Sequence, residues 1–207
     1  MRRAVFPDCR APHSVRLRHG NRHPALGGPL HTYRSATIDL NNPLYKLGEA
    51  VLKQKEAEGF EFKFFEGEEA YSKVREVYDI SADSFQGGPL YSEIPYEFFT
   101  EIYLSWTKNI NPAMFIAYRD GEAVGYVYGY ENIYDRAFIS KTSAVKKKYQ
   151  KNKLYLALIY LGYKHIMSRG YTEALYHFEC EQRVTFKHFD ENIESNEKKY
   201  AVYIKEL

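Results

Sequence analysis

Five lysines fall within eight residues of the stretch VKKKYQKNKLY (145–155). A cluster of this kind has three interpretations: a nucleic-acid patch, an ordinary solvated loop, or a cradle for a phosphorylated cofactor. The flanking patterns favour the third. A β-rich run (137–145) precedes the cluster and an apolar run of helical length (153–169) follows it, so the lysines lie where a strand turns into a helix.

Such a strand–helix junction is where ligands of α/β sheets bind. The N-terminus of the helix presents unpaired backbone N–H groups and the positive end of its dipole to an anion. Asn152 is the predicted N-cap, which makes Lys153 and Leu154 the first helical residues. The sequence therefore predicts an anion site at this junction, with the lysines adding positive potential.

Other chemistry-bearing side chains form no recognisable constellation. The two cysteines, Cys9 and Cys180, give neither a disulfide framework nor a paired ligand motif, which is consistent with a reducing cytoplasm. Cys180 has no histidine and acid at the spacing of a nucleophilic triad. The histidines of the body (His165, His177, His188) are scattered singly, so we expect no metal site.

The elements around the lysine cluster follow from hydrophobic periodicity. A helix is predicted between Pro43 and Gly59, and strand 60–65 follows it. The next segments predict a helix over 68–85, a second over 94–110, and a hairpin over 114–131 that turns at Asp120-Gly121. Strand 137–145, buried helix 153–169, strand 172–179, a weaker segment and closing strand 198–207 complete the order.

From residue 60 onward this order is β-α-α-β-β-β-α-β-(α)-β. Residues 137–179 form a βαβ unit, which predicts two parallel neighbouring strands joined by the buried helix. The expected fold class is α/β (α+β): a mixed, mostly antiparallel sheet with a central βαβ unit and flanking helices.

The order of elements and the junction resemble the GCN5-related N-acetyltransferases, the GNAT superfamily. Their motif runs from a strand ending in Val, through a Tyr-containing turn, to Gln/Arg-x-x-Gly-x-Gly/Ala at the helix start. The positions that match are Val145, Tyr149, Gln150 and Leu158. The resemblance covers roughly residues 60–207, including YRDGEAVGYVYGY as the family's hairpin, RGYTEALYHF as its helix-to-fifth-strand turn, and KKYAVYIKEL as the closing strand of many bacterial members.

The resemblance implies an acyltransferase that uses acetyl-CoA or another acyl-CoA as cosubstrate, without a metal. In that family two strands, here 137–145 and 172–179, splay apart around the pantetheine arm. Backbone N–H near Val145 would stabilise the thioester oxyanion, and amides of 150–155 would hold the pyrophosphate. The implied cofactor-binding residues are Ser143, Val145, Gln150, Lys151, Asn152, Lys153, Leu154 and Tyr155.

The motif also departs from the family pattern. Lys147 replaces the usual Pro, Lys153 the first Gly, and Tyr155 the second Gly or Ala. Lys153 still supplies an amide and a charge, whereas the Tyr155 ring could point away from the cofactor, stack on an altered ligand or block the groove. The catalytic candidates are Glu179, near the position of the family's acid, and Tyr134, after the third strand.

Charge is distributed unevenly along the chain. The net charge of +2 combines +6 in residues 1–34 with −4 in residues 35–207. The basic segment 1–34 has three interpretations: a nucleic-acid arm, a transit peptide, or a disordered or foreign segment in front of a domain at 35–207. It lacks the apolar region of a secretory signal, and no apolar run predicts a membrane span.

Three functions stay open at this point. The first is an N-acyltransferase of the cytoplasm acting on a small-molecule or protein amine. The second is a non-catalytic protein of the same fold with a disabled cofactor groove. The third is a nucleic-acid-binding protein that uses the basic N-terminal arm, which the negative body and the lack of a nucleic-acid module disfavour. Neither the acceptor nor the oligomeric state, a homodimer included, can be predicted from the sequence.

Overall fold

A computed structural model of the chain describes residues 31–40, 43–88, 91–107, 110–132, 137–180 and 198–202. Its strands are β1 (His31–Asp39), β2 (Phe60–Glu66), β3 (Pro112–Arg119), β4 (Glu122–Asn132), β5 (Ala137–Val145), β6 (Glu173–Cys180) and β7 (Lys198–Val202). Its helices are α1 (Pro43–Ala57), α2 (Glu68–Ser72), α3 (Val74–Phe85), α4 (Tyr96–Thr107), the 3₁₀ helix η1 (Lys147–Asn152) and α5 (Leu154–Ser168).

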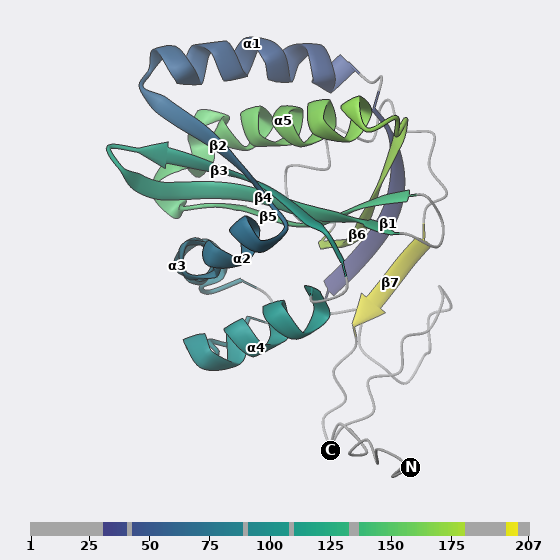
Figure 1. The fold of residues 1–207 in the computed structure, drawn as a ribbon. Helices are drawn as coiled ribbons and strands as arrows, with labels where there is room; N and C mark the ends of the chain where they lie inside the picture. Colours follow the sequence, from purple (N-terminus) through teal and green to yellow (C-terminus); the bar gives the residue numbers. More distant parts are fainter. Residues whose placement is uncertain are drawn as a thin grey trace.

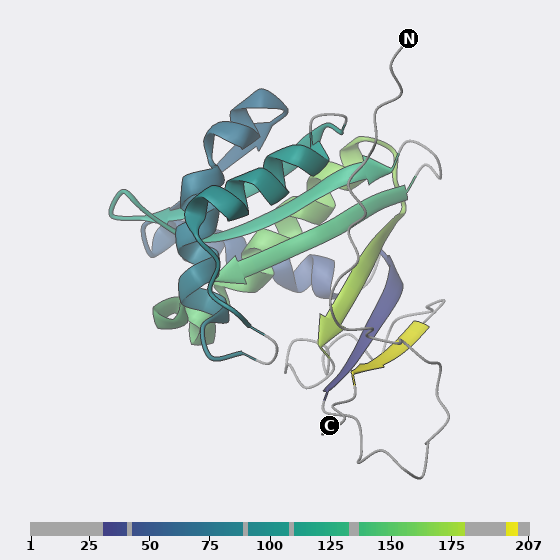
Figure 2. The same ribbon diagram turned by 90° about the horizontal axis from the view of Figure 1, so that it is seen from below.

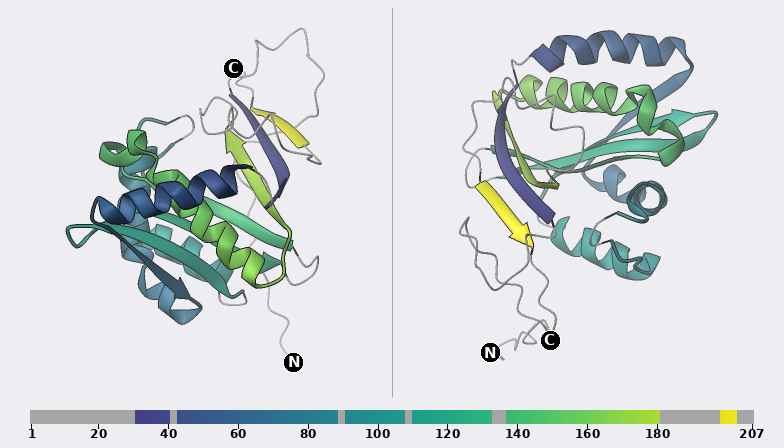
Figure 3. Two further views of the ribbon diagram at one scale, coloured as in Figure 1. Left: turned by 90° about the horizontal axis from the view of Figure 1, so that it is seen from above. Right: turned by 180° about the vertical axis from the view of Figure 1, so that it is seen from behind.

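The strands form one sheet with helices on both faces. The strand order is β2-β3-β4-β5-β6-β1-β7, and every neighbouring pair is antiparallel except β5 and β6. Helices α1 and α5 lie side by side over one face, while α2, α3 and α4 cover the other (Figures 1 and 3). The predicted fold class and the parallel βαβ unit are therefore confirmed.

The alternation of the strands supplies both layers of the core. On the face of the sheet under α5, Val127, Val145 and Leu158 belong to one buried cluster. On the other face of the sheet, Tyr126 and Ala144 are buried against α3 and α4. Residues 153–169 are apolar around most of the helix because α5 packs on the sheet and on α1 at once. A view from below shows α3 and α4 crossing the opposite face (Figure 2).

Two parts of the fold differ from the expectation. The predicted helix 68–85 is two helices, because the chain breaks at Lys73 between α2 and α3. The strand β1 was not predicted, and the boundary placed at residue 34 falls inside it. This strand inserts between β6 and β7 and pairs with both, for example Tyr33 with Cys180 and with Tyr200.

Some expectations lie outside the described residues. These are the weaker segment between residues 181 and 197, the end of the closing strand at 203–207, and nearly all of the basic segment 1–34. Within the described residues, no helix has the length and apolar character needed to cross a bilayer.

Candidate functional site

The two parallel strands at the centre of the sheet separate partway along. β5 pairs with β6 only through Phe138, Ile139 and Ser140, whose partners are Ala174, Leu175 and Tyr176. Beyond this point β6 continues along β1, and β5 continues along β4 alone. We call Ala137–Ser140 the closed half of β5 and Lys141–Val145 the open half.

A β-bulge marks the point of separation. Tyr128 of β4 lies opposite Thr142, but the next residue, Gly129, lies opposite Ser140, so Lys141 is an extra residue in β5. Bulges bend a strand and disrupt local pairing, which accounts for the departure of β5 from β6 at this residue. The splayed strands implied by the resemblance are thus present.

The open half leads directly into the lysine cluster. After Val145 the chain forms η1, and α5 begins at Leu154. The amide of Lys146 donates to the Val124 carbonyl (2.8 Å), which fixes the start of the loop on β4. At its end, Asn152 Oδ1 accepts from the Leu154 amide (3.0 Å). The loop therefore delivers the helix N-terminus to the carboxyl end of β5.

Lys153 departs from the sequence-based expectation. The prediction made Asn152 the N-cap and Lys153 the first helical residue, but Lys153 itself is the N-cap and its φ is 65°. This left-handed conformation costs a residue with a side chain about 1–2 kcal/mol, and glycine adopts it freely. The position is the one that aligns with the first glycine of the motif the sequence resembles, and its left-handed φ is a conformation that glycine adopts without strain.

Helix α3 holds the loop from the side. The Lys147 amide donates to Asp83 Oδ2 (2.6 Å), and Gln150 Nε2 lies 3.3 Å from Ser84 Oγ. Gln150 Nε2 also donates to the Val145 carbonyl (3.0 Å), which folds its side chain back over the strand end. Gln150 thus stabilises the loop through its own amide. Asp83 and Ser84 were not predicted as part of the site, because no local motif marks a contact between segments more than sixty residues apart.

The five lysines are not equivalent. Lys146 Nζ forms an ion pair with Glu122 (2.6 Å), Lys147 Nζ approaches Gln86 Oε1 (3.5 Å), and Lys148 Nζ lies over the Tyr149 ring. Lys151 and Lys153 are exposed, and neither side chain has a partner within the described part of the chain. Only these last two charges are uncommitted and beside the start of α5.

The remaining cofactor-binding candidates lie on the α5 side of the sheet. Val145 is in the core cluster under α5, and strand alternation places Ser143 on the same face. Tyr155 is half-buried and packs against that same cluster. This packing was not among the three outcomes considered for the ring from the sequence.

The catalytic candidates Glu179 and Tyr134 stay predictions. Glu179 belongs to β6, where its backbone pairs with Arg34 of β1. This is the stretch of β6 beyond the separation point. Tyr134 lies outside the described residues. Among the described residues, no group of three histidines, cysteines or carboxylates could hold a metal ion.

Comparison with known proteins gives matches to solved structures alone. No protein-family model matches the chain, and no curated protein matches it in sequence. A tandem GNAT protein from the clavulanic acid biosynthesis pathway superposes with a TM-score of 0.58 at 9% identity, covering 86% of this chain and 54% of that one. A GCN5-related N-acetyltransferase from Sphaerobacter thermophilus gives 0.57 at 15% identity, covering 84% and 51%.

A conserved protein of unknown function from Staphylococcus epidermidis is similar to the same degree, with a TM-score of 0.54 at 7% identity over 86% of this chain and 62% of that one. The chain thus spans between half and two thirds of the length of these structures. At such low identity the likeness establishes the fold. The chain has the GNAT fold, as the resemblance in its sequence implied.

Proposed function

We propose that the protein is an N-acyltransferase that moves an acetyl or other short acyl group from acyl-CoA to an amine. The observation that carries the proposal is the junction itself. β5 leaves β6 at a bulge, and its open half leads through η1 to the N-terminus of α5, beside two uncommitted lysines. The separated strands leave a backbone edge along which the extended pantetheine arm of CoA can lie. The helix N-terminus provides backbone N–H donors for a phosphate.

In this proposal the pyrophosphate binds at residues 150–155. Lys151 and Lys153 supply charge, while the dipole of α5 adds a partial positive charge at the same place. The Tyr155 ring packs against the core cluster under α5. In this proposal the anion binds the backbone of the loop without displacing that ring. Asn152 holds the Leu154 amide, and it would release that donor to a bound phosphate oxygen.

The transfer step needs an amine, a thioester and a proton acceptor. The neutral amine attacks the thioester carbonyl, the C–N bond forms, the C–S bond breaks, and the thiolate of CoA takes up a proton. Backbone N–H near Val145 would stabilise the oxyanion, with Ser143 lining the path of the arm. Glu179 or Tyr134 would accept the proton that the ammonium loses before attack, directly or through water.

Calorimetric titration with CoA and acetyl-CoA tests the binding step. We expect micromolar affinity, about tenfold weaker in Lys151→Ala/Lys153→Ala because two charges beside a helix N-terminus are removed. Lys164→Ala, which removes an exposed lysine from the far half of α5, is the matched control and should bind normally. Absence of binding at high micromolar protein would refute the proposal.

Turnover is measured separately, as release of the CoA thiol from acetyl-CoA with a panel of small amines and peptide N-termini. Binding without thiol release for any amine would instead support a non-catalytic GNAT-fold protein. One observation favours that alternative: Asp83 places a carboxylate on the Lys147 amide, next to the proposed anion site. The nucleic-acid alternative rests on the basic segment 1–34, nearly all of which lies outside the described residues. Within the loop, Lys146 is paired with Glu122 and Lys147 contacts Gln86.

A further inference from the structure

The strand β2 forms one edge of the sheet. Within the described residues it pairs with β3 on one side and with no strand on the other. Seen from above, it lies at the margin of the sheet opposite to β7 (Figure 3). An edge of this kind presents a row of backbone donors and acceptors that can pair with a strand of another chain.

The register with β3 identifies which backbone groups point outward. The Gly67 amide donates to the Pro112 carbonyl (3.0 Å), and from there the register continues without a bulge to Phe60 opposite Arg119. Hydrogen-bonded and non-hydrogen-bonded pairs alternate along an antiparallel ladder, so the odd-numbered residues of β2 direct their N–H and C=O groups toward β3. The even-numbered residues therefore direct theirs away from the sheet.

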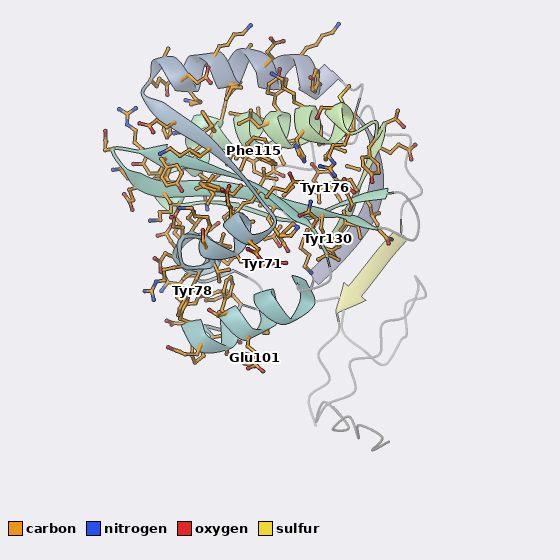
Figure 4. All side chains as sticks on the ribbon, in the orientation of Figure 1. Tyr71, Tyr78, Glu101, Phe115, Tyr130 and Tyr176 are labelled. Atoms are coloured by element: carbon orange, nitrogen blue, oxygen red, sulfur yellow. The ribbon has the colours of Figure 1, made fainter. Side chains whose placement is uncertain are left out.

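These even-numbered residues are mostly aromatic. Phe60 and Phe62 pack against the core under α1 and α5, and Phe64 lies on the same face, with its ring centroid 4.8 Å from that of Phe115, which is labelled in Figure 4. Phe64 is one of the few large apolar side chains of the described residues that is exposed, at 38%. The outward backbone groups thus accompany a row of rings that a neighbouring strand could cover.

The opposite face of β2 carries one acid and one base. Glu61 and Lys63 are both exposed, and their charged groups lie 3.5 Å apart in the same chain. A lysine in an edge strand opposes pairing wherever it meets another positive charge, so it restricts the registers that a second strand can adopt.

We propose that two copies of the chain pair through β2, antiparallel about a two-fold axis at Phe62. The outward groups allow only registers in which even-numbered residues meet each other. An axis at Glu61 or at Lys63 would set two like charges directly opposite. An axis at Phe62 places Glu61 opposite the partner's Lys63, and Lys63 opposite the partner's Glu61.

The same register completes the row of rings. Phe62 meets the partner's Phe62, and Phe60 meets the partner's Phe64, and each of these pairs exchanges backbone hydrogen bonds. Glu61 and the partner's Lys63 form a non-hydrogen-bonded pair, in which side chains approach more closely. The contact does not depend on the proposed function, because β3 and β4 separate β2 from β5 and from the candidate site.

Sedimentation equilibrium of the full chain tests the pairing. We expect a dimer with a dissociation constant in the micromolar range, since one strand pair buries less than a standard interface. Glu61→Lys and Lys63→Glu each set like charges opposite at both symmetry-related contacts, so each should weaken the dimer at least about tenfold. The double variant Glu61→Lys/Lys63→Glu restores opposite charges and should dimerise like the wild-type protein.

Lys46→Glu changes an exposed lysine in the first turn of α1, at the end of that helix away from β2, and is the control for net charge. Urea denaturation of each variant checks that it folds. A wild-type chain that stays monomeric would overturn the proposal. A dimer that the single variants leave unchanged, or that the double variant does not recover, would overturn it as well, because the contact would then lie elsewhere.

Discussion

The closed and open halves of β5 belong to one strand but have different neighbours. The closed half is hydrogen-bonded on both edges, to β4 and β6, whereas the open half is bonded to β4 alone. One extra residue, Lys141, separates them. One strand can thus contribute to fold stability with one half and leave a backbone edge unpaired with the other, provided that a bulge redirects it.

The largest effect is expected from a substitution that disrupts the packing beside the closed half. In Gly129→Ala the new Cβ would lie 2.6 Å from the Ile139 carbonyl oxygen and collide with the Phe138 ring. Because a backbone atom cannot move aside cheaply, we expect a loss of about 3 kcal/mol in the free energy of unfolding, measured by urea denaturation.

Gly125→Ala is the matched change beside the open half. There the nearest atom is Leu158 Cδ1 at 3.1 Å, the flexible end of a side chain, so we expect a loss of about 1 kcal/mol or less. Equal losses in the two variants would contradict the idea that the closed half is the more tightly packed of the two.

A second prediction concerns the tether that positions the loop after the open half. Asp83→Ala removes the acceptor of the Lys147 amide, and we expect acyl-CoA to bind about tenfold more weakly, in line with the loss of one hydrogen bond to a charged group. Asp83→Asn keeps an acceptor and removes the negative charge, so it should bind at least as well as wild type. Calorimetry measures both, with Asp79→Ala on the same helix as control; tighter binding by Asp83→Ala would show that the carboxylate obstructs the site.

A third prediction tests the left-handed backbone conformation of Lys153. Lys153→Gly and Lys153→Ala both remove the charge, but only glycine adopts a φ of 65° without strain. We expect the glycine variant to be more stable than the alanine variant by about 1 kcal/mol in thermal or chemical denaturation. If alanine is the more stable, the left-handed turn does not form in solution.

The smallest effect is expected from His165 of α5, whose ring packs against Phe64 and Phe115. Desolvation lowers the pKa of His165 from its ordinary value of 6.5, with Glu66 and Glu131 opposing that shift and Arg169 adding to it. The unfolded chain therefore binds the proton first, and stability should fall as the pH drops below about 6.5. Denaturation of the wild-type protein and of His165→Phe between pH 5 and 8 should show a shallower decline of stability in the variant. Parallel curves would contradict the assignment of this decline to His165.

Local patterns predicted most of the elements. The apolar run of α5, the Asp120-Gly121 turn and the alternating strand Phe60–Glu66 were all visible in the sequence and are confirmed. Hydrophobic periodicity and turn chemistry act over short distances, so a single sequence reveals them.

The remainder depends on contacts between distant segments. β1 has the sequence HTYRSATID, which lacks a clear apolar alternation, and its partners lie about 140 residues away in β6. The tether from Asp83 to Lys147 and the left-handed φ of Lys153 are equally invisible to local rules. The position of the candidate site could thus be predicted from the strand–helix junction, whereas the contacts that shape it could not.

The insertion of β1 between β6 and β7 also bears on how the chain assembles during synthesis. β2, β3 and β4 are neighbours in sequence and in the sheet, so this part can form as soon as it leaves the ribosome. β1 has to wait, because both of its partners, β6 and β7, are made long after it. Until then β1 lacks a neighbour on both edges, and an unpaired edge is prone to association with other chains. We expect truncation before residue 198 to produce aggregation rather than a smaller folded protein.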